Sequence, residues 1–284
     1  MKNILLIIFS FSMNLAMLEV QAQDFSGADK LGWKIGSQAY TFRQFTLEET
    51  LDKLNDLGLK HVELYGNQTI GAGIEGTTDY KMSGEKRQQL KDLLQSKGIT
   101  PVAFGVTSGG NEEEWRQLFE FAKDMGIGII TSEPQYNHLD IVESLCKEYN
   151  IKVAIHNHPI PSRYWHPDIV LNLLEGRSPL IGVCADLGHW LRSGLDPVES
   201  LQKLEGRVLS FHFKDLNQAG VRSSHDVHWG TGWSNIAGVM NEMKRQGFQG
   251  PISVEYEHNW DNNVPDVRAS ILYFARVANS LADR

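Results

Sequence analysis

Ionisable side chains end the last three β-rich runs of this 284-residue chain. Asp186 ends one run, and His212 and Lys214 lie at the end of the next. Glu255 and Glu257 lie at the end of the last. Because side chains alternate between the two faces of a strand, the apolar neighbours of these groups take one face and the ionisable groups take the other. Carboxylates gathered in an apolar interior repel one another, and a divalent cation removes that repulsion by taking them as ligands.

This pattern predicts a site for one divalent metal ion. Its predicted ligands are Asp186, His212, Glu255 and, in the fourth position, Glu133. His156 competes with Glu133 for that position, and we favour Glu133 because His156 is also well placed as a base. Glu133 is in phase with Ile129 along its strand, so we expect an irregularity before Pro134 to turn it inward. Carboxylate and imidazole ligands together suit Mn, Zn, Co, Fe(II) or Mg.

A metal at this position predicts proton-transfer chemistry next to a carbonyl group. The ion would chelate a carbonyl and its neighbouring hydroxyl and stabilise the enediolate formed when an α-proton is removed. The candidate catalytic residues are His156, His158, Lys214 and Glu257. An imidazole is the natural base near neutral pH, with Glu257 or Glu63 as alternatives, and Lys214 either stabilises an oxyanion or pairs with a carboxylate. The candidate substrate-binding residues are Glu63, His189, Trp190, His228 and Trp229.

Eight β-rich runs, each followed by a loop and a helical pattern, must position these residues. The runs are residues 35–40, 61–65, 101–106, 127–132, 152–156, 181–186, 208–213 and 252–255. Such alternation predicts parallel strands joined by crossover helices, and eight units in about 250 residues is the size of a single (β/α)8 TIM barrel. The alternative, a doubly wound open sheet, lacks a glycine-rich nucleotide fingerprint after the first strand. Two long loops, residues 66–82 and 216–233, fall at the end where barrel enzymes place their sites.

Residues 1–22 have the pattern of a secretory signal peptide, which leaves residues 23–284 as the barrel domain. Lys2 precedes an apolar run, and Val20 and Ala22 provide small residues before a cleavage site. We therefore expect an exported, periplasmic protein with no membrane anchor after cleavage.

The net charge of -8 argues against nucleic-acid binding, which needs a basic surface. We expect Cys146 and Cys184 to be buried thiols. The sequence is compatible with either a monomer or a homo-oligomer.

After residue 22, nearly the whole chain resembles the xylose isomerase-like TIM-barrel proteins of the sugar phosphate isomerase/epimerase type. The motifs that carry the resemblance are residues 184–189 (CADLGH), 211–215 (FHFKD), 229–232 (WGTG) and 253–257 (SVEYE). The resemblance implies a divalent metal held at the barrel mouth by Glu, Asp, His and Glu. Asp186, His212 and Glu255 match three of these ligands. The family's first Glu usually ends the fifth strand, where this chain has His156 and His158.

On this last point the chain is similar to secreted relatives with Glu-Pro on strand 4 and His-x-His on strand 5, which supports Glu133 as the substitute. The resemblance implies a metal-dependent sugar isomerase or epimerase that acts through an enediolate. Some members of the wider superfamily cleave 3-keto-glycosides by elimination, and such a lyase in extracytoplasmic glycan processing is the alternative. Related barrels also include DNA-repair endonucleases, which need several metals and a basic groove. A non-catalytic sugar-binding protein is the alternative from another class.

Overall fold

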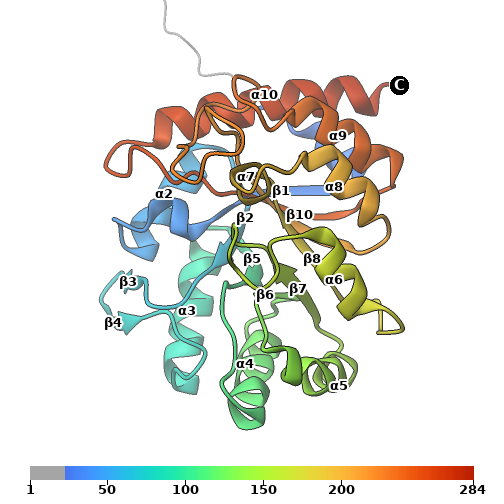
Figure 1. Cartoon of the computed structure of the whole chain (residues 1–284). Helices are drawn as coiled ribbons and strands as arrows, with labels where there is room; N and C mark the ends of the chain where they lie inside the picture. The colour runs from blue at the N-terminus through green and yellow to red at the C-terminus, as the bar shows by residue number, and fades with distance from the viewer. Residues whose placement is uncertain (1–22) are drawn as a thin grey trace, which may run out of the picture.

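Eight parallel strands close into a barrel with helices around its outside (Figure 1). The computed structural model describes residues 23–284, so the predicted signal peptide lies outside the described residues. Neighbouring strands follow the order β1-β10-β9-β8-β7-β6-β5-β2, and β2 pairs with β1 to complete the ring. The prediction of a single (β/α)8 barrel is confirmed.

Each of the eight predicted runs overlaps one barrel strand. These strands are β1 (Trp33–Gln38), β2 (His61–Leu64), β5 (Thr100–Phe104), β6 (Ile129–Ser132), β7 (Lys152–His156), β8 (Ile181–Asp186), β9 (Val208–Phe213) and β10 (Gly250–Val254). The long loop after β2 carries a feature that the sequence analysis missed, an antiparallel hairpin of β3 (Thr69–Gly71) and β4 (Ile74–Thr77). In Figure 1 this hairpin lies at the side of the barrel.

Helices pack against the outside of the barrel. The longer ones are α2 (Leu47–Asp56), α3 (Gly84–Ser96), α4 (Glu112–Asp124), α5 (Leu139–Tyr149), α6 (Pro167–Leu174), α8 (Pro197–Lys203), α9 (Ile236–Arg245) and α10 (Val264–Ala282). The short ones are α1 (Ser26–Leu31), η1 (Ala39–Phe42), η2 (Tyr136–His138) and α7 (Leu187–Arg192). Local sequence sets their boundaries: the Ser83 and Asn111 side chains accept hydrogen bonds from the first turns of α3 and α4. Gly126, with φ +70°, follows α4 in the left-handed conformation that glycine adopts without strain.

Apolar side chains form two layers. The larger layer fills the space between the strands and the helices. A small cluster of Ala103, Ile129, Ala154 and Cys184 fills the inside of the barrel. Because Ile129 points inward, strict alternation along β6 already turns Glu133 inward, and no irregularity before Pro134 is required. Our expectation on that point is corrected.

Two further findings concern the chain as a whole. Cys146 and Cys184 are free, buried thiols, as expected. Between residues 23 and 284, no helix combines the length and the apolar character that crossing a membrane requires.

Candidate active site and metal centre

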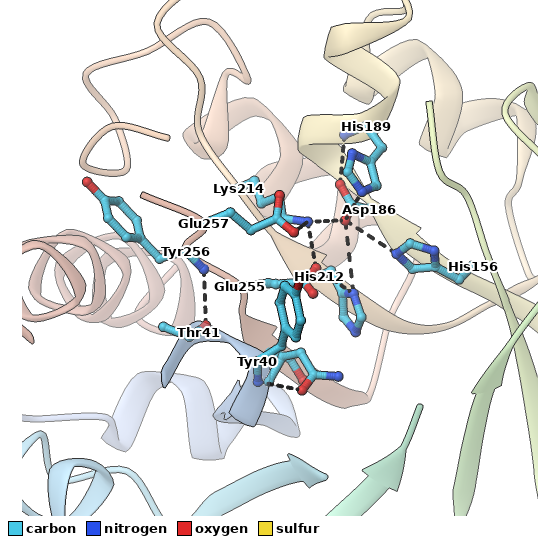
Figure 2. A network of polar contacts seen from close by, with 12 residues as sticks. Tyr40, Thr41, His156, Asp186, His189, His212, Lys214, Glu255, Tyr256 and Glu257 are labelled. Atoms are coloured by element: carbon cyan, nitrogen blue, oxygen red, sulfur yellow. Dashed lines mark hydrogen bonds and ion pairs between the residues drawn. The ribbon is translucent and has the colours of Figure 1, made fainter. Parts of the chain in front are cut away.

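The carboxyl ends of β7, β8, β9 and β10 bring four metal-ligating side chains together. They are His156, Asp186, His212 and Glu255, and one ligand atom of each lies within 4.8 Å of the others. All four side chains are buried, and Figure 2 shows His156 and His212 both directed at Asp186. Three of the four predicted ligands therefore meet, with His156 as the fourth member in place of Glu133.

The nitrogen atoms of this group fit a divalent cation. His156 Nε2 and His212 Nδ1 are buried and have no hydrogen-bond partner among residues 23–284. His156 Nε2 lies 3.4 Å from Asp186 Oδ2, and His212 Nδ1 lies 2.9 Å from Glu255 Oε2 without hydrogen-bond geometry. Buried polar atoms are almost always bonded, and a cation shared with the carboxylates would satisfy both nitrogens. Two imidazole nitrogens and two carboxylate oxygens form a donor set suited to Mn, Zn, Co or Fe(II).

A carboxylate lies behind each of these two histidines. Glu63 Oε2 is 2.9 Å from His212 Nε2, and Glu133 Oε1 is 3.1 Å from His156 Nδ1. A carboxylate that holds the proton of one ring nitrogen leaves the lone pair of the other nitrogen for a metal and fixes the ring orientation. The two contacts use opposite nitrogens, and in both rings the remaining nitrogen faces Asp186. Glu63 and Glu133 are therefore placed to orient the histidines.

These positions change the predicted roles of both glutamates. Glu63 is fully buried beneath His212 and also accepts a hydrogen bond from Ser253 Oγ at 2.9 Å, so it does not reach a substrate. Glu133 lies outside the group of four and instead forms a second group with His156 and His158. Burial opposes ionisation of Glu133, but hydrogen bonds from His156 and His158 outweigh it and hold the pKa of Glu133 well below its usual value.

His158 is the exposed member of this second group. Its side chain is 49% exposed, and it lines a cavity at the carboxyl ends of the strands. Its Nδ1 lies 2.6 Å from Glu133 Oε1, and its backbone N–H donates to the same oxygen at 3.0 Å. One carboxylate therefore fixes both imidazoles of the His-x-His motif, with His156 directed into the barrel and His158 directed into the cavity.

Lys214 is an internal counter-charge. Its Nζ donates to Asp186 Oδ2 at 2.7 Å and to Glu255 Oε2 at 2.6 Å, and it lies 3.6 Å from Glu257 Oε1 (Figure 2). Burial disfavours the ammonium ion, but the charges of Asp186 and Glu255 outweigh burial and hold the pKa of Lys214 well above its usual value. Lys214 is fully buried and is not among the cavity-lining residues, which matches the carboxylate-pairing alternative.

An open cavity of about 320 Å³ lies over the group. Its lining residues are Gln38, Tyr40, Tyr65, Gly66, Asn67, Gly105, Val106, Thr107, His156, His158, His189, Glu255 and Glu257. It spans the barrel from β7–β10, which carry the ionisable groups, to β1, β2 and β5 on the opposite side. Cavities of this size at the carboxyl end of the strands are the usual substrate sites of such barrels.

His189 and Glu257, two more predicted site residues, line this cavity. The His189 backbone N–H donates to Asp186 Oδ1 at 2.7 Å, and its Nε2 lies 3.7 Å from Asp186 Oδ2. Burial holds the pKa of His189 well below its usual value despite the opposing charge of Asp186, so the ring is neutral. Arg192 Nη1 contacts both His189 Nδ1 and Glu257 Oε2 at 3.1 Å.

The three other predicted substrate-binding residues point elsewhere. Trp190 and Trp229 are buried in the layer between strands and helices, and the Trp229 ring packs against Phe213. His228 is about half exposed and pairs with Asp266 at 2.8 Å, away from the cavity lining. Their places after strand ends suggested contact with a substrate, but position along the chain does not determine which way a loop side chain points.

The 229–232 motif has a structural explanation. Asp215 Oδ2 accepts hydrogen bonds from the backbone N–H groups of Gly230 at 2.8 Å and Gly232 at 2.9 Å. A Cβ on Gly232 would come within 2.4 Å of Asp215 Oδ1, so only glycine fits there. The motif therefore folds the loop after β9 around Asp215.

Three further polar residues support the site. Asn157 exchanges two hydrogen bonds of 2.9 Å with the backbone of Asp186 and so fixes its height above the barrel. Arg192 lies 3.4 Å from Asp226, whose pKa burial raises to about 8. Arg192 and Asp226 come from α7 and the loop after β9, and no spacing in the sequence pairs them. Asn157 lies between two histidines, and an asparagine gives a weaker indication of chemistry than the histidines beside it.

Residues 51–277 match the family described as xylose isomerase-like TIM barrel. The chain belongs to this family. A crystal structure of an uncharacterised protein from Parabacteroides distasonis ATCC 8503 is 42% identical, with a TM-score of 0.71, and the match covers 86% of this chain and 99% of that one.

Two curated relatives carry enzyme names. Inosose dehydratase of Clostridium tetani is 28% identical over 130 residues, which are 45% of this chain and 37% of that enzyme. The 3-dehydroshikimate dehydratase of Bacillus anthracis is 23% identical over 187 residues, 65% of this chain and 61% of that enzyme. The match thus spans less than two thirds of the length of either enzyme.

Proposed function

We propose that this chain is a divalent-metal-dependent enzyme that removes a proton next to the carbonyl of a keto-sugar or sugar derivative and so forms an enediolate. One observation carries the proposal: four ligand atoms, from His156, Asp186, His212 and Glu255, gather within 4.8 Å of one another at one side of a sugar-sized cavity. A protein that only bound sugar would have no need for two buried, unpartnered imidazole nitrogens beside two buried carboxylates.

The four ligand atoms define what the ion would contribute. The ion would be held by His156 Nε2, Asp186 Oδ2, His212 Nδ1 and Glu255 Oε2. The candidate ions are divalent Mn, Zn, Co, Fe and Mg. When bound, a divalent ion polarises a substrate carbonyl and stabilises negative charge on its oxygens. Glu63 and Glu133 keep the two histidines in the orientation that binds it.

His158 is the proposed base. Its Nδ1 proton is held by Glu133 Oε1 at 2.6 Å, which leaves the Nε2 lone pair to accept a proton. The carboxylate stabilises the imidazolium that forms, as in other carboxylate–histidine pairs. Because His158 is about half exposed and lines the cavity, a substrate carbon can approach it. Glu257, which also lines the cavity, is the alternative base.

Lys214 and His189 support the reaction without taking the α-proton. Lys214 keeps Asp186 and Glu255 ionised, since its ammonium contacts both carboxylates. The neutral His189 has its Nδ1 beside the Arg192 guanidinium, so Nε2 carries the proton and can donate it to a substrate oxygen.

The fate of the enediolate decides the reaction. Return of the proton to the neighbouring carbon gives isomerisation, return to the other face gives epimerisation, and departure of a group from the β-carbon gives elimination. Elimination is the second candidate because the two curated relatives are dehydratases by name. A 3-keto-glycoside would lose its glycosidic oxygen by the same route, with the leaving oxygen taking up a proton.

Loss of α-deuterium tests the proposal. Free ketoses and 3-keto-glycosides labelled at the α-carbon are incubated with the Mn-loaded protein, and label and products are followed by NMR. We expect loss of the label in the wild type and its retention in His212→Ala and Glu255→Ala. His61→Ala, at the start of β2 and outside the cavity lining, is the matched control and should exchange normally. Sugar binding with full retention of label would instead indicate a non-catalytic binding protein.

A further inference from the structure

The two sides of the cavity differ in charge. We call the residues from β7 to β10 the ligand wall: His156, His158, His189, Glu255 and Glu257. We call those that follow β1, β2 and β5 the neutral wall: Gln38, Tyr40, Tyr65, Gly66, Asn67, Gly105, Val106 and Thr107. In the described chain, residues 23–284, neither wall contains a lysine or an arginine, and the ligand wall adds two carboxylates.

The two cations nearest the ligand wall are already paired. Lys214 is fully buried, and its ammonium contacts Asp186 and Glu255. The Arg192 guanidinium contacts Glu257 at 3.1 Å and Asp226 at 3.4 Å. Either side chain would have to break a charge-assisted contact to reach an anionic substrate, and breaking a buried pair costs several kcal/mol.

The cations on the surrounding loops are engaged as well. The Arg43 guanidinium lies 4.0 Å from the centre of the Trp260 ring and donates to the Tyr40 hydroxyl. Arg163 donates to the backbone carbonyl of Pro134, and Arg222 donates to that of Ile160. None of the three side chains lines the cavity. The residues that line the cavity in the described chain therefore offer no lysine or arginine to a phosphate or carboxylate on a substrate.

The neutral wall instead offers the groups that bind uncharged sugars. The rings of Tyr40 and Tyr65 meet edge to face at 5.3 Å and give an apolar surface next to hydroxyl groups. Asn67 is exposed at the cavity edge, and its amide can both donate to and accept from a hydroxyl group. Burial raises the pKa of Tyr65 to about 12, so its hydroxyl stays neutral across physiological pH.

Resting on the proposed function, we propose that the substrate of this site is an uncharged sugar or polyol. Its reacting carbons face the ligand wall, and its far end lies against Tyr40, Tyr65 and Asn67. Among the described residues no lysine or arginine lines the cavity, and an anion buried without a partner is costly. The Bacillus anthracis relative is named after 3-dehydroshikimate, which carries a carboxylate. The cavity of this chain differs from a site for such an anion. It also excludes phosphorylated sugars.

A matched pair of ligands tests the inference. Binding of D-fructose and D-fructose 6-phosphate to the Mn-loaded protein is measured by isothermal titration calorimetry. We expect the phosphorylated sugar to bind at least tenfold more weakly. Asn67→Arg should strengthen binding of the phosphorylated sugar about tenfold, whereas Asn241→Arg, which adds the same charge to the exposed side of α9, should not change it.

Tighter binding of the phosphorylated sugar by the wild type would overturn the inference. Exchange of α-deuterium in the same samples separates it from the proposed function. Preference for the neutral sugar without exchange upholds the substrate class and counts against the enediolate reaction. Exchange of deuterium on a phosphorylated sugar that binds more tightly would uphold the enediolate reaction and contradict the proposed substrate class.

Discussion

The ligand wall and the neutral wall face each other across one cavity, yet their side chains are held in opposite ways. On the ligand wall, His156 and Glu255 are buried and each is fixed by a second polar group. On the neutral wall, Tyr40 and Tyr65 are only partly buried and Asn67 is exposed. Fixed, buried polar groups provide preorganised chemistry, whereas exposed neutral groups adapt to different ligands. Substitutions on the ligand wall should therefore cost stability and metal affinity, and those on the neutral wall should cost only substrate affinity.

The largest effect is expected from Lys214→Met. Methionine keeps the volume of the side chain but leaves Asp186 and Glu255 buried side by side without their counter-charge. We expect the free energy of unfolding of the metal-free protein to fall by about 3–5 kcal/mol, as measured by urea denaturation with a chelator present. Added Mn should restore much of the loss. Lys81→Met is the control, because its pair with Glu114 is exposed to solvent and should contribute little to stability. Equal losses in both variants would contradict this account.

Glu63→Gln should weaken metal binding without removing a ligand. It keeps the shape of Glu63 but takes away the negative charge behind His212, so we expect Mn affinity to fall by about 10–100-fold. Equilibrium dialysis measures the change. Glu75→Gln, on the exposed strand β4, is the matched control and should bind Mn as the wild type does. Unchanged affinity in Glu63→Gln would show that the buried carboxylate does not tune the site.

Tyr65→Ala probes the neutral wall alone. Loss of the ring should weaken binding of an uncharged sugar by about 0.5–1.5 kcal/mol, or roughly 2–10-fold, while Mn affinity stays the same. Tyr136→Ala, which removes an exposed tyrosine outside the cavity lining, should alter neither quantity. A parallel loss of Mn affinity in Tyr65→Ala would mean that the two walls are not independent.

The last prediction concerns the pH dependence of stability and is measured as a difference between two slopes. Burial raises the pKa of Asp226 from 3.8 to about 8. The folded state therefore keeps the Asp226 proton when the unfolded chain has released it. This contribution to stability is complete below pH 3.8 and declines as pH rises to about 8, by at most about 1.4 kcal/mol per pH unit. Urea unfolding between pH 5 and 8 should show a shallower decline in Asp226→Asn, and equal slopes would contradict the assignment.

The barrel and three members of the ligand group could be predicted from sequence because they follow from short-range rules. Strict alternation of strand and helix gives the barrel, and alternation along β8, β9 and β10 directs Asp186, His212 and Glu255 inward. The fourth member could not be assigned in this way. His156 and Glu133 both point inward from neighbouring strands, and their distances to Asp186 depend on side-chain conformation.

The remaining misses involve loops and long-range pairs. Trp190 and Trp229 follow strand ends, but an indole packs equally well in a cavity wall or in the layer under the helices, where the structure places both. Arg192 and Asp226 meet only after β8 and β9 have been brought together. Most of the neutral wall was also missed, because amide, glycine and valine side chains carry no chemical signal until the opposite side of the barrel is known.

The central claim is that one divalent ion is held by His156, Asp186, His212 and Glu255. Titration of the metal-free protein with Mn, with bound metal counted by elemental analysis, tests it most directly. We expect one ion per chain in the wild type and an affinity more than 100-fold weaker in His212→Ala, since loss of a ligand should exceed loss of a carboxylate behind it. A wild type that binds no Mn, Zn or Co, or a His212→Ala variant that binds as tightly as the wild type, would contradict the account.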